Sequence, residues 1–387
     1  MADTRILHAA WFTPGHRGRM GLPLRAIGMP GTAKTSLGEQ TAQADGLLPI
    51  VVIASLNDPT EIKGMPYVKQ DGSVGYTPPA WALEANAAVN GAVVIFDEVN
   101  DAPPSVQSAL HRVILEGRVG DYQLAPTVRF VAFQNDAEHA SNHHDLSAAF
   151  ANRFGTLTDW QAPSPTAWAA WLLAAGNGHE VIPSERTATE ETDRVLAAWP
   201  VAYAEASALV AAYIRRHPQA LHVQPPADSP QASAGYPTRR SWEMATRAMA
   251  GAKIHGLDPE ETDRFVGAFI GVAALSEFRV WEVALDLPDP AAVLDKRIAF
   301  KADPNRMDRT MVVLNACAAL VTPTNAEHRD ARGQVLWSIV KANMAQADIA
   351  FAAVLAMVKA KVAHRCADAG AVLAVFQPLF QASGALS

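Results

Sequence analysis

A glycine-rich segment near the N-terminus has the residue types that bind a phosphate chain. Residues 28–35 read GMPGTAKT, between an apolar run and a stretch with helical character. Glycine-rich backbone can turn its N–H groups toward a phosphate, and the helix dipole adds to the attraction. Lys34 would reach the β- and γ-phosphates of a nucleotide, and the Thr35 hydroxyl would bind Mg²⁺. The general pattern has glycine before the lysine, where this chain has Ala33; a negative φ would tolerate the methyl group.

Two adjacent carboxylates follow a second apolar run. Residues 92–98 read AVVIFDE. In phosphate-loop ATPases an aspartate at this strand end holds Mg²⁺, so we expect that role for Asp97. Glu98 is well placed to orient and polarise an attacking water. Two carboxylates at a buried strand end are costly without a metal or a basic partner, which also favours a nucleotide site.

The order of the two motifs predicts one nucleotide site at neighbouring strand ends. Its expected nucleotide-binding residues are Gly28, Pro30, Gly31, Thr32, Ala33, Lys34, Thr35, Ser36 and Asp97. Thr35 and Asp97 are the expected Mg²⁺ ligands.

The elements that position these residues follow an alternating pattern. Between residues 20 and 160, short apolar runs alternate with helical stretches, as in βαβ units with a parallel sheet. The runs are apolar at consecutive positions, which indicates strands buried on both faces. The expected strands are residues 22–27, 50–54, 93–96, 128–133 and 156–160, and the expected helices are 34–44, 79–90 and 104–116. The predicted fold class is therefore α/β.

After residue 160 the sequence changes to alanine-rich helical stretches without strand runs. Loops are expected at 176–193 and at the proline-rich segment 217–238, with a further break at 286–310. The chain is thus predicted to have three parts. These are an α/β nucleotide-binding domain over residues 1–160, a helical domain over 161–285 and a helical extension over 286–387.

Composition narrows the class of protein. The chain has 387 residues and a formal net charge of -7, which disfavours broad wrapping by nucleic acid. Cys317 and Cys366 are too few for a disulfide framework or a zinc knuckle. The most apolar stretch, residues 197–214, contains Pro200 and Glu205, so no membrane span is predicted. We expect a cytoplasmic protein without a signal peptide.

Residues 96–110, FDEVNDAPPSVQSAL, closely resemble the MoxR-type AAA+ ATPases, which read DEINRAPPxxQSALLEAM. That family commonly has GxPGxAKT at the phosphate loop, with the same alanine as Ala33. Residues 59–64 are similar to its PSDxxG, and residues 76–81 read YTPPAW before the next helix. The resemblance spans about residues 20–160 and implies an AAA+ domain that binds ATP with Mg²⁺, followed by an all-helical lid.

The resemblance also assigns roles by position. Residues 131–135, VAFQN, look like the family's ATQNP, which makes Asn135 the sensor-one residue that orients the attacking water. Residues 146–154 are similar to LPEAxxDRF, which makes Arg153 the arginine finger acting on a neighbouring subunit's nucleotide. Residues 237–243, PTRRSWE, resemble the lid motif PRxWE. This makes Arg240 the sensor-two candidate, with the adjacent Arg239 as an alternative.

The resemblance implies a hexameric ring that hydrolyses ATP and remodels a protein client, often beside a partner with a von Willebrand factor A-type domain. The insert at 60–77 would face the central pore and touch the client; a solvated loop is the alternative. A second hypothesis is an ATP-gated scaffold with negligible turnover. A nucleic-acid translocase is disfavoured by the acidic balance. The histidines His139, His143 and His144 lie near carboxylates, but a polar loop is favoured there over a Zn²⁺ site.

Overall fold

The computed structural model describes residues 2–136, 146–169, 181–223, 225, 234–303, 305–324, 326–362 and 369–383. The chain forms two compact units. Unit 1 comprises Met1–Trp199 with Leu221–Leu275, and unit 2 comprises Pro200–Ala220 with Ser276–Ser387. This division into two units does not test the three domains expected from the sequence, whose boundaries remain predictions.

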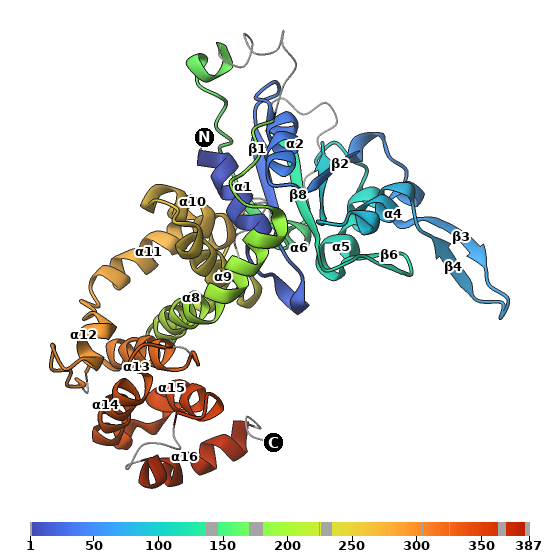
Figure 1. Cartoon of the computed structure of the whole chain (residues 1–387). Coiled ribbons are helices and arrows are strands. Elements are labelled where there is room, and N and C mark those ends of the chain that lie inside the picture. Colours follow the sequence, from blue (N-terminus) through green and yellow to red (C-terminus); the bar gives the residue numbers. More distant parts are fainter. Residues whose placement is uncertain are drawn as a thin grey trace. The chain divides into compact units, whose positions relative to one another are not determined.

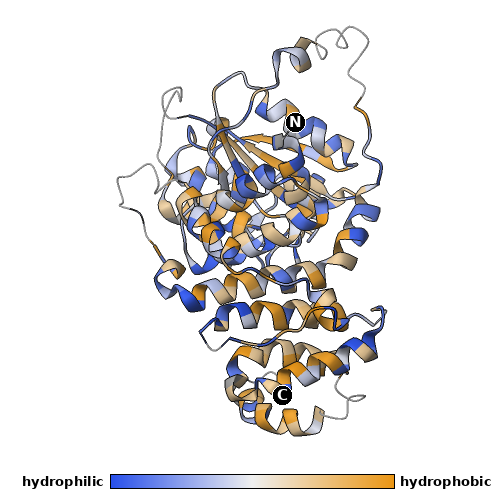
Figure 2. Cartoon of the chain, turned by 90° about the vertical axis from the view of Figure 1, so that its left-hand side faces the viewer, coloured by the Kyte–Doolittle hydropathy of each residue, from blue (hydrophilic) through white to orange (hydrophobic). Residues whose placement is uncertain are grey.

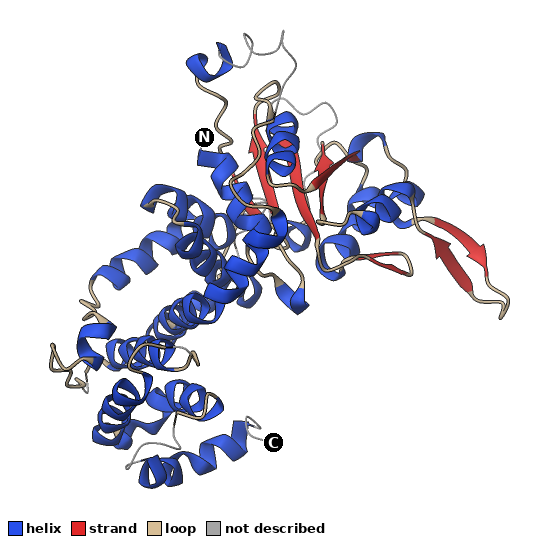
Figure 3. Ribbon diagram, viewed as in Figure 1, coloured by secondary structure: helices blue, strands red, loops and turns tan. Residues whose placement is uncertain are grey.

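A five-stranded parallel sheet forms the centre of unit 1 (Figure 3). Its order is β2 (Leu48–Ile53), β5 (Ala92–Asp97), β8 (Val128–Asn135), β1 (Leu24–Gly28) and β9 (Gly155–Leu157). The predicted parallel α/β fold is therefore confirmed. Because all five strands run in one direction, the residues that follow β1, β5 and β8 meet at the same edge.

The central strands are buried on both faces, as their consecutive apolar residues predict. The first five residues of β5 and the first seven of β8 are buried, and Figure 2 shows the hydrophobic character of the sheet. Two helices have the predicted bounds, α2 (Lys34–Ala44) and α5 (Pro104–Glu116). Gly117 ends α5 in the left-handed conformation with φ 62°. The third, α4 (Ala80–Ala87), is shorter than predicted.

The insert after β2 is regular structure rather than an irregular loop. It consists of the short helix α3 (Pro59–Lys63) and an antiparallel hairpin of β3 (Met65–Val68) and β4 (Val74–Thr77) (Figure 1). The side chains of Met65, Val68 and Val74 are more than half exposed. A second small hairpin pairs β6 (Arg118–Val119) with β7 (Tyr122–Gln123).

Helices from both ends of unit 1 pack together. The N-terminal helix α1 (Ala2–Phe12) contacts α2, α9 (Arg239–His255) and α10 (Pro259–Ile270), and α10 also contacts β9. Capping boxes begin two of these helices, through Thr238 at α9 and Asp258 at α10. The short elements α6 (Ala148–Ala151), η1 (His16–Gly18) and η2 (Ala54–Leu56) complete the described elements of this region.

Two long helices contribute residues to both units, α8 (Ala188–Arg216) and α11 (Val272–Val283). The sequence predicts a loop over 176–193, but α8 begins at Ala188, within that range. Pro200 lies inside α8 and does not end it. In the described part of the chain, α8 alone is long and apolar enough to cross a membrane, judged by length and composition. A third of its most apolar stretch is buried inside the structure, and Ala212 and Tyr213 are among the buried residues of the helix.

Most of the remaining helices of unit 2 share one core. They are α12 (Pro290–Leu294), α13 (Met307–Val321), α14 (Arg329–Ala342), η5 (Met344–Gln346), α15 (Ala347–Lys359) and α16 (Ala369–Ser383). The short helix η3 (Pro218–Leu221) buries Ala220. Trp337, Leu336, Val354 and Phe376 are fully buried in the shared core. Cys317 is buried there as well, and burial raises the pKa of its thiol to about 12. Cys366 lies outside the described residues.

Helix α2 lies so close to the sheet that a side chain at Gly38 would collide with it. A Cβ at Gly38 would lie 2.9 Å from Cε2 of Phe133 in β8. We therefore expect Gly38→Ala to lower the free energy of unfolding by about 1–3 kcal/mol, as overpacked core substitutions do. The midpoint of thermal unfolding measures it. Gly370→Ala is the control, since nothing lies within 4 Å of the added Cβ; an unchanged midpoint for Gly38→Ala would contradict this packing.

Candidate functional site

The phosphate-loop motif connects β1 to α2, and its lysine is already enclosed by the loop. Lys34 is the first residue of α2 and is only 7% exposed. Its Nζ donates hydrogen bonds to the carbonyl oxygens of Gly28 and Met29, both at 2.8 Å, and to Oδ1 of Asn135 at 3.2 Å. Burial lowers the pKa of Lys34, while the charges of Asp97 and Asp136 oppose that shift. The ammonium group is thus held where three oxygen acceptors converge.

The loop between β1 and α2 has left-handed backbone at two positions, on either side of Thr32. Gly31 has φ 75°, and Ala33, the N-cap of α2, has φ 60° and ψ 27°. The negative φ that would tolerate the methyl group is therefore not present at Ala33, because the chain turns into α2 through a left-handed residue there. The loop contains Pro30 and Thr32, whose hydroxyl donates to the carbonyl of Met29 at 2.7 Å. Ser36 lies in the first turn of α2.

The two expected metal ligands meet at this edge of the sheet. Thr35 in α2 donates its hydroxyl hydrogen to Oδ2 of Asp97, the last residue of β5. A hydroxyl and a carboxylate are the hard oxygen ligands that Mg²⁺ prefers when it is bound together with a nucleotide. The donor set therefore fits the Mg²⁺ expected from the sequence.

Glu98 follows Asp97 in a conformation that is rare for a residue with a side chain. Its φ is 55°, and its N–H donates to Oδ1 of Asp97 at 2.8 Å. Its Oε2 accepts a hydrogen bond from the hydroxyl of Ser55 in η2, which directly follows β2. The left-handed backbone and the serine together fix where the Glu98 carboxylate points.

Asn135 lies at the end of β8, beside the phosphate loop. It pairs in register with Gly28 of β1, and its side-chain oxygen accepts the hydrogen bond from Lys34. Its backbone carbonyl accepts a hydrogen bond from Nδ2 of Asn100 at 3.2 Å. Lys34, Thr35, Asp97 and Asn135 are thus brought together by direct contacts, and Glu98 adjoins them.

The two expected arginines lie elsewhere. Arg153 and Arg240 both line a cavity of about 460 Å³ that also contacts Leu22 and Pro23, the residues just before β1. The phosphate loop follows the opposite end of that strand. The cavity is therefore at the amino-terminal edge of the sheet, whereas Lys34 and Asp97 are at its carboxyl edge.

This cavity is strongly cationic. The arginines that line it are Arg17, Arg19, Arg153, Arg239, Arg240 and Arg247, with Glu243 as a carboxylate among the lining residues. Burial lowers the pKa of Arg153, and the nearby charge of Arg240 adds to that shift. Arg153 donates from Nη1 to the carbonyl of His111 at 3.2 Å, while its buried Nε has no hydrogen-bond partner. Such a concentration of guanidinium groups favours a polyanionic ligand.

Two residues of the site escape sequence reasoning. Ser55 has no motif around it that signals contact with Glu98. Trp160 was expected only as the last residue of the strand 156–160, yet it lies beyond β9 and its Nε1 donates to the carbonyl of Thr32 at 3.3 Å. Its Cβ would lie 2.8 Å from a Cβ added at Gly28, so glycine is required there. His139, His143 and His144 lie outside the described residues.

The comparisons with known proteins agree with this arrangement. Residues 26–154 match the family model of the AAA domain (dynein-related subfamily). This part of the chain is therefore similar to AAA domains. The match covers the strands and loops that carry the phosphate-loop lysine, the paired carboxylates and Arg153. The AAA domain and the parallel sheet followed by helices support an AAA+ ATPase in general terms.

A solved structure described as "a putative ATPase" from Cytophaga hutchinsonii is similar to the chain. The two are 17% identical, with a TM-score of 0.46, over 73% of this chain and 87% of that one. No curated protein matches the sequence.

The left-handed alanine gives a stability prediction. An alanine at φ 60° is strained, and glycine adopts that conformation readily, so Ala33→Gly should raise the free energy of unfolding by about 0.5–1 kcal/mol. Chemical denaturation monitored by circular dichroism measures the change. Ala42→Gly in the same helix is the matched control: Ala42 is buried and helical, so the same substitution should destabilise there. An equal decrease in the free energy of unfolding for the two variants would rule out strain at Ala33.

Proposed function

We propose that this chain is a MoxR-type AAA+ ATPase that hydrolyses ATP in a ring oligomer, expected to be a hexamer, and remodels a protein partner. The observation that carries the proposal is the separation of two sets of groups. The phosphate loop and carboxylates lie at one edge of the sheet, and the arginine-lined cavity at the other.

At the carboxyl edge, the chain's own residues would bind and orient the reactants. Lys34 would exchange its hydrogen bonds to the surrounding oxygens for hydrogen bonds to the β- and γ-phosphates. Thr35 and Asp97 would hold Mg²⁺, which supplies neutralisation of the phosphate charge when bound. Glu98 would accept the proton of the attacking water, and Asn135 would orient that water.

At the amino edge, the arginines have no access to that nucleotide. β1 has five residues and so spans about 16 Å between the two edges. The position of Arg153 therefore supports its role as an arginine finger. It would neutralise transition-state charge on the nucleotide of a neighbouring copy. Since Arg240 lines the same cavity, we extend the proposal to it: sensor two also acts on the neighbour, with Arg239 as the alternative.

A contact in which one edge meets the opposite edge of the next copy is heterologous, and such contacts form a closed ring or an open helical ring, depending on whether the rotation between copies closes. The exposed apolar side chains of the β3–β4 hairpin support a role in touching the client. The proposal also includes a client with a von Willebrand factor A-type domain, which the resemblance implies. It includes a cytoplasmic location, which the composition implies.

One observation favours the second hypothesis, an ATP-gated scaffold with negligible turnover. The Glu98 carboxylate is tied to Ser55 on a strained backbone. Oε2 of Glu98 would have to exchange the serine hydroxyl for the attacking water. The scaffold would bind nucleotide and assemble but release little phosphate.

Specific ATPase activity measured across protein concentration separates the two hypotheses. Glu98→Gln serves as the blank, because it should bind ATP yet turn over about 10²–10⁴-fold more slowly. Lys34→Ala should abolish nucleotide binding. Activity that rises with concentration to a plateau supports a site completed by assembly. Activity at the blank level throughout, with nucleotide still bound, supports the scaffold, and wild-type turnover in Glu98→Gln would show that the base is wrongly assigned.

Mixing two inactive variants tests the contribution of the neighbour. Arg153→Ala should lower turnover by about 10³-fold or more with little change in nucleotide affinity. A subunit with Arg153→Ala keeps its phosphate loop, and a subunit with Lys34→Ala keeps its arginine, so mixed rings should regain activity. Arg112→Ala, which removes an exposed arginine paired with Glu116 in α5, is the control and should leave turnover unchanged. No recovery on mixing would place Arg153 at its own nucleotide.

A further inference from the structure

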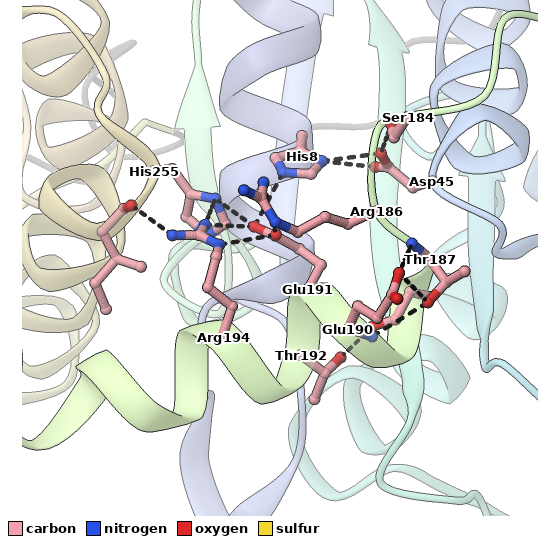
Figure 4. Close-up of polar contacts among 12 residues, drawn as sticks. His8, Asp45, Ser184, Arg186, Thr187, Glu190, Glu191, Thr192, Arg194 and His255 are labelled. Carbon is pink, nitrogen blue, oxygen red and sulfur yellow. Dashed lines mark hydrogen bonds and ion pairs between the residues drawn. The ribbon is translucent and has the colours of Figure 1, made fainter.

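A cluster of two histidines and a glutamate lies inside unit 1, apart from the nucleotide site (Figure 4). His8 comes from α1, Glu191 from the first turn of α8, and His255 is the last residue of α9. Their potential ligand atoms all lie within 4.8 Å of one another. Three elements that are distant in sequence thus converge on one point.

The spacing of these atoms is close to that of a tetrahedral metal site. With Zn²⁺–ligand bonds of about 2.0–2.1 Å, neighbouring ligand atoms are separated by about 3.3–3.4 Å. Nδ1 of His255 lies 3.3 Å from Oε1 of Glu191, and Nε2 of His8 lies 3.6 Å from the same oxygen. Small side-chain movements would bring all three atoms to bonding distance of one ion.

The histidine in α1 has the outer partner typical of a metal ligand. Its Nδ1 lies 2.9 Å from both carboxylate oxygens of Asp45, which follows α2. Asp45 is 3% exposed and accepts a further hydrogen bond from the Ser184 hydroxyl at 2.7 Å. This arrangement orients the ring so that Nε2 faces Glu191, as in carboxylate–histidine–metal triads.

The second histidine is almost completely enclosed. The side chain of His255 is 2% exposed, and its Nε2 has no hydrogen-bond partner. The other ring nitrogen, Nδ1, faces Glu191, so it is the atom that would bond to a metal in the cluster.

Three cationic groups contact Glu191 as it stands, namely Arg186, Arg194 and His8 (Figure 4). Nη2 of Arg194 lies 2.5 Å from Oε1 of Glu191 and 3.4 Å from Nδ1 of His255, close to where a metal would sit. Burial disfavours a charged His8, but hydrogen bonds to Asp45 and Glu191 outweigh it and raise its pKa to about 9. Because the guanidinium of Arg194 is planar and rigid, Nη2 leaves its place only if the whole group turns away, which also breaks the bonds from Nε to Oε2 of Glu191 and from Nη1 to the carbonyl of Ile254.

Solvent reaches the cluster through a cavity of about 520 Å³, which His8, Asp45 and His255 help to line. The cavity provides a path for an ion and room for a water molecule as fourth ligand. We propose that His8, Glu191 and His255 bind a divalent transition-metal ion, for which Zn²⁺ fits best, with Asp45 orienting His8. Imidazole ligands distinguish this site from the all-oxygen site of Thr35 and Asp97.

Isothermal titration with Zn²⁺ tests the site, using the full chain without a polyhistidine tag and after chelation. We expect one Zn²⁺ per chain, lost in His255→Ala and in His8→Ala. His328→Ala is the matched control, because it removes an exposed histidine that pairs with a glutamate, Glu327, at 3.3 Å. Binding that persists in both His8→Ala and His255→Ala, or that disappears in His143→Ala instead, overturns the proposal, as does the lack of any binding.

Two further variants keep all three ligands, so they test the site even if the histidine variants do not fold. Asp45→Asn should weaken Zn²⁺ binding by about 10–100-fold, as loss of an outer carboxylate does. Arg194→Gln should tighten it, because the competing guanidinium is removed. An ion-pair cluster without a metal role predicts no Zn²⁺ binding in either variant. X-ray absorption should show imidazole scattering around the bound Zn²⁺, and a spectrum without it counts against the site.

Discussion

The parallel direction of β1, β8 and β5 is the constraint on which the nucleotide site depends. Each strand ends at the same edge, so Gly28, Asn135 and Asp97 arrive together although they are far apart in sequence. The helix that follows β1 then begins at that edge, with its positive end toward the phosphate loop. The buried strands, with no polar side chains in the middle of β5, are what make this alignment stable.

Bringing these groups to one edge of the sheet requires unfavourable backbone conformations and the burial of a charged side chain. Ala33 and Glu98 both adopt left-handed φ values, and Lys34 is taken out of solvent. Ala33 and Glu98 lie on the loops that would contact the nucleotide, and Lys34 begins the helix after the first loop. None of the three lies in β1 or β5. Strain of this kind is stable only where the surroundings hold it, and here the Lys34 hydrogen bonds and the Ser55 contact do so.

The sequence predicts the parts of the fold that local patterns determine. The bounds of α2 and α5 follow from the glycine-rich loop, Pro104 and Gly117, and the buried strands follow from their consecutive apolar residues. The φ of Ala33 could not be predicted, because it depends on how the loop connects β1 to α2. Nor could the contact between Ser55 and Glu98, since adjacency of β2 and β5 creates it. The cationic cavity likewise unites residues before β1 with residues of α9.

Helix α2 links these observations within unit 1. At its first residue, Lys34 holds the phosphate loop, and immediately after its last residue, Asp45 holds His8 of α1. His8 in turn faces Glu191 of α8. Glu191 contacts Arg194 of the same helix and His255 of α9. A displacement of α2 on nucleotide binding would therefore act on charged contacts at its other end, because α2 lies against Phe133 and has little freedom to bend. Whatever cation occupies that cluster sets how firmly α1, α8 and α9 are held to the nucleotide-binding helix.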